Sequence, residues 1–160
     1  MQIEMTIKLM VDPITNLPII LLRDRDGQRV LPIWVGASEA NAIALQIENI
    51  TTPRPMTHDL LRNVIHDLKA EIRKVVVSDL KDNTFYALIH LEVNGEALAV
   101  DPRPSDAIAL ALRARAPIFV EDRVIDNAKT NDFAPDKTDA ERLQKWLESL
   151  DPDEMGKYKM

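Results

Sequence analysis

The chain has 160 residues, of which 46% are hydrophobic, so we expect one domain with its own core and a short tail. A net charge of −6 and the absence of cysteine exclude a globally basic nucleic-acid-binding protein, disulfides, thiolate metal sites and a cysteine nucleophile. The sequence has neither an apolar run near the roughly 18 residues of a membrane span nor a signal-peptide pattern at its start. We therefore expect a cytoplasmic protein without membrane contact, in which any contact with nucleic acid needs a local basic patch or metal ions.

Alternation of polar and apolar residues, broken by turn residues, predicts a chain rich in strands. Strands are predicted, in chain order, at residues 3–11, 17–22, 30–35, 72–80, 83–93, 97–100 and 118–120. Asp26-Gly27 predicts a hairpin turn in the first block of strands. Asn94-Gly95 predicts a type I′ hairpin in the second, because that turn needs a positive φ at both positions. Pro18 and Pro32 each remove a donor from the ladder, which predicts an edge or a bulge there.

Helical patterns separate and follow these strands. Helices are predicted at residues 38–50, 57–68, 105–113, 123–129 and 138–150. Ser38, Thr57 and Ser105 are expected to cap the first three, because a hydroxyl can accept from a free amide of the first turn. The last helix is amphipathic and begins with a capping box at Thr138. Its apolar stripe must be covered, so we expect it to pack on the domain or on a second subunit and the protein to be at least a dimer.

The two halves of the chain look alike. Ala42-Ile43-Ala44-Leu45 matches Ala107-Ile108-Ala109-Leu110, and each copy follows three predicted strands. The predicted fold class is α+β, with duplicated three-strand-plus-helix units, two central helices and a C-terminal amphipathic helix. We expect the halves to superpose about a pseudo-twofold axis. Residues 1–130 are predicted to form the domain, and residues 131–160 a linker, the last helix and a tail.

The stretch Ala99–Arg113 runs from a short strand through two prolines into a helix. Helix cannot begin before the second proline, and the residues beyond it are apolar except for a stripe with Asp106 and Arg113, which predicts burial. Asp101, Arg103 and Asp106 are therefore charges held at the start of a buried helix, where free amides and the helix dipole favour anions. The alternative is structural: Asp106 only complements the dipole, and Arg103 only pairs with Asp101.

Several familiar catalytic patterns are missing from the sequence. It has no glycine-rich phosphate loop, no HExxH and no Gly-x-Ser-x-Gly, and its three histidines do not have ligand spacing. Carboxylates at predicted helix starts remain, namely Glu39, Asp59, Asp101 and Asp106. Two or three of them together would hold Mg²⁺ or Mn²⁺ through oxygen, and such ions assist phosphodiester hydrolysis. The alternative is that acidic residues simply favour first turns.

Three stretches, in the order WVGASEANAIAL, RPMTHDLL and DPRPSDAIALALR, resemble the bifunctional nuclease domain family. The resemblance covers roughly residues 5 to 130. It implies an α+β fold with a duplicated core, and degradation of both DNA and RNA, so that nucleic acid is the expected partner. The last helix and the tail resemble an extension that many bacterial members carry.

Two classes of function stay open at this point. The first is a metal-assisted nuclease, in which His58 moves a proton and Arg103 or Arg54 holds a phosphate. Its predicted residues are Asp101, Asp106, His58 and Glu39 for catalysis, Asp101, Asp106 and Asp59 for Mg²⁺ or Mn²⁺, and Arg103, Arg54 and Ser105 for the substrate. The second is a non-catalytic module whose helix start binds a small anion or a partner chain, for regulation or assembly. In either case we expect Asp101, Arg103 and Asp106 to share one pocket with Glu39 or His58.

Overall fold

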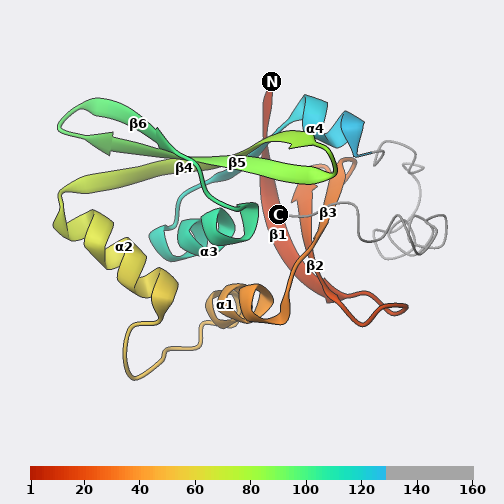
Figure 1. Cartoon of the computed structure of the whole chain (residues 1–160), viewed down its shortest axis with the longest axis horizontal. Coiled ribbons are helices and arrows are strands. Elements are labelled where there is room, and N and C mark those ends of the chain that lie inside the picture. Colours follow the sequence, from red (N-terminus) through yellow and green to blue (C-terminus); the bar gives the residue numbers. More distant parts are fainter. Residues whose placement is uncertain (129–160) are drawn as a thin grey trace.

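The structure is a computed structural model of the chain, and it describes residues 1–128. Within this range the chain forms one seven-stranded sheet and four helices, so the predicted α+β class is confirmed (Figure 1). The strands are β1 (Gln2–Val11), β2 (Pro18–Asp24), β3 (Val30–Trp34), β4 (Ala70–Lys81), β5 (Thr84–Val93), β6 (Glu96–Val100) and β7 (Ile118–Glu121). The helices are α1 (Ala37–Ile47), α2 (Thr57–Asp67), α3 (Pro104–Ala114) and α4 (Asp122–Asn127).

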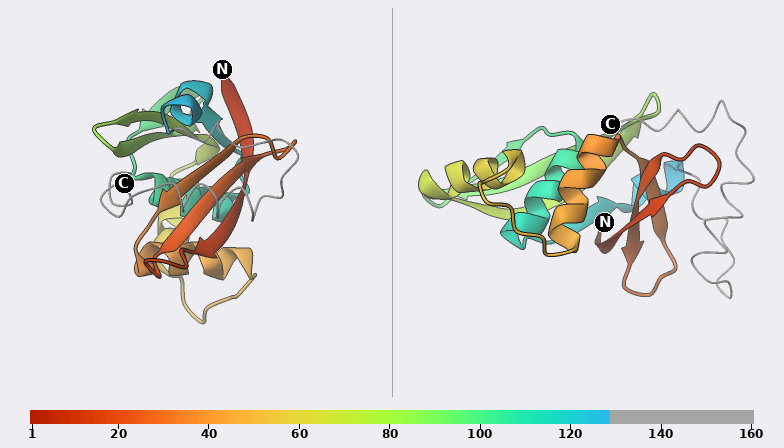
Figure 2. Two further views of the ribbon diagram at one scale, coloured as in Figure 1. Left: turned by 90° about the vertical axis from the view of Figure 1, so that its right-hand side faces the viewer. Right: turned by 90° about the horizontal axis from the view of Figure 1, so that it is seen from below.

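The sheet consists of two antiparallel meanders on either side of β7. Its order is β3-β2-β1-β7-β4-β5-β6, with β7 antiparallel to β1 and parallel to β4. Each meander is followed by a helix, α1 or α3, and these two helices pack against each other (Figure 2). This is the element order expected from a duplication, while the superposition of the two halves stays a prediction.

The turn and proline signals of the sequence correspond to the observed strands. Asn94 and Gly95 both have positive φ, 52° and 80°, as the predicted hairpin requires. Pro32 lies in β3, which is an edge strand, and Pro18 is the first residue of β2. At both positions the missing N–H of proline does not interrupt the hydrogen bonds inside the sheet.

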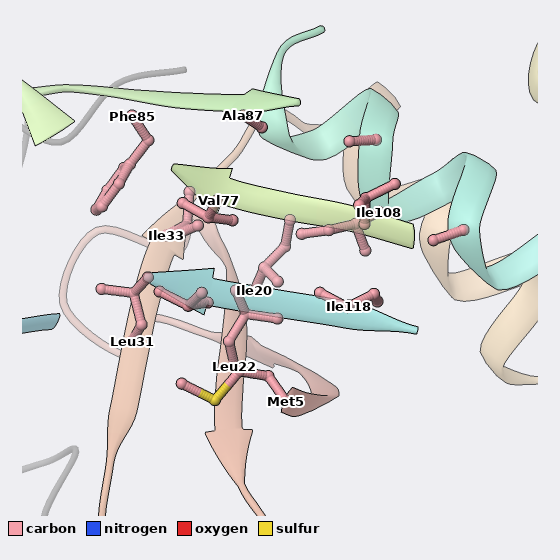
Figure 3. Close-up of a cluster of buried hydrophobic side chains, with 14 of the residues drawn as sticks. Met5, Ile20, Leu22, Leu31, Ile33, Val77, Phe85, Ala87, Ile108 and Ile118 are labelled. Atoms are coloured by element: carbon pink, nitrogen blue, oxygen red, sulfur yellow. The ribbon is translucent and has the colours of Figure 1, made fainter. Parts of the chain in front are cut away.

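The hydrophobic core joins the two meanders to α3. Figure 3 shows side chains from both halves converging on one cluster, among them Met5, Ile20, Leu22, Leu31, Ile33, Val77, Phe85, Ala87, Ile108 and Ile118. Ile108 and Leu110 of α3 are fully buried, and most other residues of this helix are buried as well, as the sequence predicted. Each such aliphatic side chain stabilises the fold by about 1.5–3 kcal/mol. Helix α3 is therefore anchored in the core, and its first turn has little freedom to move.

Helix α2 is packed quite differently. None of its residues is buried, although it contacts α3 and β4. Ile65 packs against the core, but the rest of the apolar face of α2, made of Leu60, Leu61, Val64 and the C-cap residue Leu68, has exposed fractions from 40% to 71%. This helix consequently depends on polar contacts for its position more than α1 or α3 does.

The predicted helix caps are wrong. The N-cap residues are Gly36, Met56 and Arg103, and Ser38, Thr57 and Ser105 lie within the first turns instead. In α3, Pro104 takes the first helical position, where its fixed φ and missing N–H suit the helix. In α2, the amide of Met56 donates to Asp59 Oδ2 at 2.9 Å, so a carboxylate of the first turn bonds back to the N-cap.

Two further expectations concern the ends and the surroundings of the chain. The predicted linker, C-terminal helix and tail at residues 131–160 lie outside the described residues. Between residues 1 and 128, no helix is long and apolar enough to cross a membrane.

Candidate functional site

A cleft of about 750 Å³ lies where α1, α2 and the β6–α3 connection meet. Glu39 reaches it from α1, His58 from α2 and Asp106 from α3, while Asp101 and Arg103 reach it from the connection. The prediction that Asp101, Arg103 and Asp106 share a pocket with Glu39 or His58 is thus confirmed, and both of the latter line it. The roles of these residues stay predictions.

The connection between β6 and α3 holds its charged side chains in fixed places. Arg103 precedes a proline and has the extended backbone that this position favours, with φ −72° and ψ 147°. The helix after it is anchored in the core, so Asp106 in its first turn has little freedom to shift. A stiff connection next to a buried helix is the kind of scaffold that a binding or catalytic site needs.

Four side chains form one network in the cleft, which we call the Asp106 cluster (Glu39, His58, Arg103 and Asp106). Asp106 Oδ1 lies 2.9 Å from His58 Nε2, and Arg103 donates from Nε to Asp106 Oδ2 at 2.9 Å and from Nη2 to Oδ1 at 3.3 Å. Arg103 Nη1 also donates to Glu39 Oε1 at 3.0 Å. One guanidinium therefore bridges the starts of α1 and α3, and the alternative that Arg103 only pairs with Asp101 is wrong.

Asp106 and Arg103 stabilise each other's charged forms. Burial raises the pKa of Asp106, but the hydrogen bonds from Arg103 and His58 outweigh it and hold that pKa below its ordinary value. The hydrogen bonds to Asp106 and then to Glu39 raise the pKa of Arg103. At neutral pH the Asp106 carboxylate is thus ionised and acts only as an acceptor.

Glu39 reaches Arg103 because Gly36 leaves it room. A Cβ built on Gly36 would overlap Glu39 Oε2, so the missing side chain is what lets this carboxylate fold back over the end of the strand. A glycine at position 36 therefore permits the close approach of a charged side chain.

Arg113 makes contacts between helices that were not predicted from the sequence. Its side chain is only 3% exposed, and it donates from Nε to Asp59 Oδ1 at 2.7 Å. It also donates from Nη1 to the carbonyl of Ala109 and from Nη2 to that of Ala42, both at 2.9 Å. Arg113 therefore ties α2 to α1 and α3, and so sets where His58 of α2 lies. The one available signal was a lone basic residue on a helix predicted to be buried.

Asp59 faces this arginine instead of the cleft. Burial raises its pKa, but the hydrogen bonds from the Met56 amide and from Arg113 outweigh the effect and lower it overall. Asp59 and Arg54 line a neighbouring pocket of about 360 Å³. The structure thus separates these two predicted site residues from the Asp106 cluster.

The remaining predicted residues have mixed positions. Ser105 is 1% exposed, and its hydroxyl has no hydrogen-bond partner within residues 1–128. Asp101 is exposed, and in the same part of the chain it makes no hydrogen bond or ion pair. Among the described residues, no three histidine, aspartate or glutamate side chains are grouped to hold a metal ion. Asp59, Asp101 and Asp106 therefore do not form one ligand set here.

A family model described as the bifunctional nuclease domain matches residues 20–132. The chain belongs to the bifunctional nuclease domain family. The matched range contains every member of the Asp106 cluster, together with Arg113 and Asp59. The family resemblance that the sequence motifs suggested is thereby confirmed.

Relatives of the bifunctional nuclease domain occur in bacteria and plants. An uncharacterized protein of Mycobacterium tuberculosis is 40% identical over 150 residues, covering 87% of this chain and 88% of its own length. Bifunctional nuclease 1 of Oryza sativa subsp. japonica is 29% identical over 112 residues, or 68% of this chain and 34% of the plant protein. Bifunctional nuclease 1 of Arabidopsis thaliana is 29% identical over 130 residues, which are 74% of this chain and 40% of the plant protein. The chain thus matches well under half the length of these plant relatives.

Proposed function

We propose that this protein is a nuclease that hydrolyses phosphodiester bonds of DNA and RNA in the cleft around the Asp106 cluster. The observation that carries the proposal is the placement of His58 Nε2 and the Arg103 guanidinium on one carboxylate, that of Asp106, in a chain of the bifunctional nuclease domain family. An acid–base side chain that moves a proton and an arginine that binds a phosphate both contribute to phosphodiester hydrolysis.

His58 is the proposed general base. In the proposed tautomer, Nε2–H donates to the Asp106 carboxylate, 2.9 Å away, and Nδ1 is the acceptor of a proton. In the proposed reaction Nδ1 takes a proton from a water molecule, the water oxygen bonds to phosphorus, and the bond from phosphorus to the leaving oxygen breaks. The proton held by His58 is then available to that leaving oxygen. Because water is the nucleophile, no 2′-hydroxyl is needed, which suits both DNA and RNA.

Arg103 is the proposed phosphate-binding residue. A guanidinium has five N–H groups, and three of those of Arg103 are used by Asp106 and Glu39, which leaves two. Its side chain is 51% exposed, so these two donors are accessible to a phosphate oxygen. The two carboxylates fix the plane of the guanidinium before a substrate arrives, which reduces the ordering needed on binding.

The charge balance of the cleft supports a divalent metal. Three carboxylates, those of Glu39, Asp101 and Asp106, line the cleft together with two arginines, Arg103 and Arg113, and Arg113 is already paired with Asp59. A cation between such carboxylates and a phosphate would relieve their repulsion, and we propose Mg²⁺ or Mn²⁺ for this place. As the side chains stand, Arg103 lies between Glu39 and Asp106, so the ligands do not form a metal group and we assign no step to an ion.

The second candidate function is a non-catalytic module that binds an anion or a partner chain. The observation that favours it is the pairing within the Asp106 cluster, where Arg103 already has carboxylate partners from its own chain. Such a cluster can hold two helices together without any reaction. The same assay distinguishes the two functions, since a binding module retains nucleic acid or anion without cleaving it.

The test is hydrolysis of labelled single-stranded DNA and RNA by highly purified protein, in EDTA, Mg²⁺ or Mn²⁺. We expect His58→Gln and Arg103→Gln each to lower the rate by about 10²–10⁴-fold, the range for loss of a positioned acid–base or charge-stabilising group. The matched controls are His66→Gln, an exposed histidine, and Arg73→Gln, whose side chain is 50% exposed and paired with Glu92. Both controls should retain the rate of the unaltered protein.

Two outcomes would contradict this proposal. If hydrolysis is the same in His58→Gln and Arg103→Gln as in their controls, the reaction occurs elsewhere or comes from a contaminant. If the protein binds nucleic acid and cleaves none under any of the three metal conditions, the binding module is correct.

A further inference from the structure

The cleft by itself is a poor binding site for a polyanion. The chain has a net charge of −6, and three carboxylates surround the one arginine of the Asp106 cluster. Proteins gain most of their affinity for a nucleic acid backbone from lysine and arginine side chains placed at phosphates. A nuclease that acts at this cleft therefore needs cationic contacts next to it.

Such contacts are present in the neighbouring pocket, which we call the α1–α2 pocket. It has a volume of about 360 Å³ and lies between the end of α1, the loop after it and the start of α2. Two arginines line it, Arg54 from the loop and Arg62 from α2. Neutral polar side chains that can donate to phosphate or sugar oxygens line it as well, namely Asn49, Thr51 and Asn63.

Arg54 is held by its backbone and not by its charged group. The hydroxyl of Thr52 donates to the carbonyl of Arg54 at 2.7 Å, and Pro53 and Pro55 restrict the chain on both sides. Within residues 1–128, the guanidinium of Arg54 makes no hydrogen bond or ion pair. All of its donors are thus available to a ligand, on a loop whose path is restricted.

Arg62 and the nearby acid complete the charge balance. Arg62 donates from Nε to Asn63 Oδ1 at 3.1 Å, a bond that leaves its two Nη groups for a ligand. The acidic residue of the pocket is Asp59, and Arg113 already pairs with it at 2.7 Å. Asp59 also attracts Arg62, but with two arginines and one carboxylate that is bonded to Arg113, the pocket keeps a net positive charge.

The pocket and the cleft are neighbours along α1. Glu39 lines the cleft and Gln46 lines the pocket, two helical turns apart, or about 10 Å at 1.5 Å per residue. We propose that Arg54 and Arg62 form a second phosphate subsite, which holds a backbone phosphate of a polynucleotide while a neighbouring phosphate lies at Arg103. The pairing with Arg103 rests on the proposed function, whereas phosphate binding by the two arginines does not.

The test is binding of a fluorescent, phosphorothioate-linked single-stranded DNA to the full chain, followed by anisotropy over a range of salt concentrations. Each phosphate contact on a single strand contributes about 0.7 to the slope of log K against log salt, which is about fivefold in affinity at 0.1 M salt. The Arg54→Gln/Arg62→Gln double variant removes this one phosphate contact, so it should bind about fivefold more weakly, with a slope smaller by about 0.7. Arg73→Gln should bind like the unaltered protein, and Arg54→Lys should retain most of the affinity because it keeps the charge.

The single variant Arg54→Gln protects the test against misfolding, because the Arg54 guanidinium makes no hydrogen bond or ion pair within the described range, and a loss of up to about fivefold is expected. The proposal is overturned if the double variant keeps the affinity and the salt slope of the unaltered protein. It is also overturned if poly-glutamate displaces the DNA as well as unlabelled oligonucleotide does, which would indicate an acidic protein partner. Should the unaltered protein cleave no nucleic acid while the double variant still loses affinity, the proposed function fails and the subsite stands.

Discussion

Replacing Arg113 by methionine should loosen α2 from the rest of the fold. Methionine fills much of the space of the arginine stem but carries no donors, so the change removes three hydrogen bonds and leaves the packing largely in place. Since α2 has no buried residue, few other contacts compensate for this loss. His58, which α2 carries to Asp106, should become less well placed as a result.

The structure gives the size of the effect. A hydrogen bond to an ionised carboxylate stabilises by about 1.5–3 kcal/mol. Asp59 is 26% exposed and keeps its bond from the Met56 amide, so the lower end, about 1.5–2 kcal/mol, applies to it. The carbonyls of Ala109 and Ala42 lie inside helices and keep their helical amide partners, so each loses only about 0.5 kcal/mol. The expected decrease in the free energy of unfolding is about 3 kcal/mol.

The measurement is equilibrium unfolding in urea for the unaltered protein, Arg113→Met, Asp59→Asn and the double variant. We expect a coupling of about 1.5 kcal/mol between the two positions and an unchanged dependence on urea. A loss below 1 kcal/mol in Arg113→Met would refute the reasoning, because it would show that α2 is held by other contacts. A coupling near zero would show that Asp59 is not the partner that matters.

Three further predictions concern other parts of the molecule. Burial raises the pKa of Asp12, but hydrogen bonds from backbone amides, a hydroxyl and Trp34 outweigh burial and lower that pKa overall. The ionised Asp12 therefore stabilises the fold above about pH 4, and this stabilisation is lost as the pH falls through the lowered pKa. In urea unfolding, Asp12→Asn should lower the free energy of unfolding by about 2 kcal/mol at pH 7 and by less as the pH falls below 4. Gly36→Ala should displace the Glu39 carboxylate from Arg103 and lower the rate of hydrolysis about tenfold, while the melting temperature stays unchanged. A variant with the full rate of hydrolysis would contradict this prediction. We also propose that the protein is at least a dimer in which the second subunit covers the apolar face of α2. Val64→Glu should then shift the protein towards monomer in sedimentation velocity, and an unaltered protein that is already monomeric would contradict the proposal.

The parts of the fold that could be predicted depend on local patterns. The strands at residues 3–11 and 83–93 were predictable from alternation and those at 17–22 and 30–35 from short apolar runs. The hairpin at Asn94 was predictable from a turn that needs positive φ. Asp101, Arg103 and Asp106 could be placed together because a strand, two prolines and a buried helix act within one short stretch. Their meeting with Glu39 required the similarity of the two halves, which put both helix starts at one place.

The parts that could not be predicted depend on how helices turn against each other. His58 and Asp59 are adjacent, and successive helical residues point about 100° apart, so a small rotation of α2 decides which of them faces Asp106. That rotation is set by Arg113, which is distant in sequence and has no local signature. The helix caps failed for a related reason, since Pro104 fixes the start of α3 and Asp59 bonds back to the start of α2.

The most direct test of the central claim, that the Asp106 cluster performs the hydrolysis, is the single-turnover cleavage rate of Asp106→Asn per mole of folded protein. Its amide keeps the shape of the carboxylate but carries no charge to hold Arg103 and orient His58. We expect a rate at least about 10²-fold below that of the unaltered protein, with a melting temperature within a few degrees because the Asp106 side chain is 33% exposed. A variant that unfolds while its folded fraction cleaves at the full rate would show that Asp106 only supports the start of α3, and would place the reaction elsewhere.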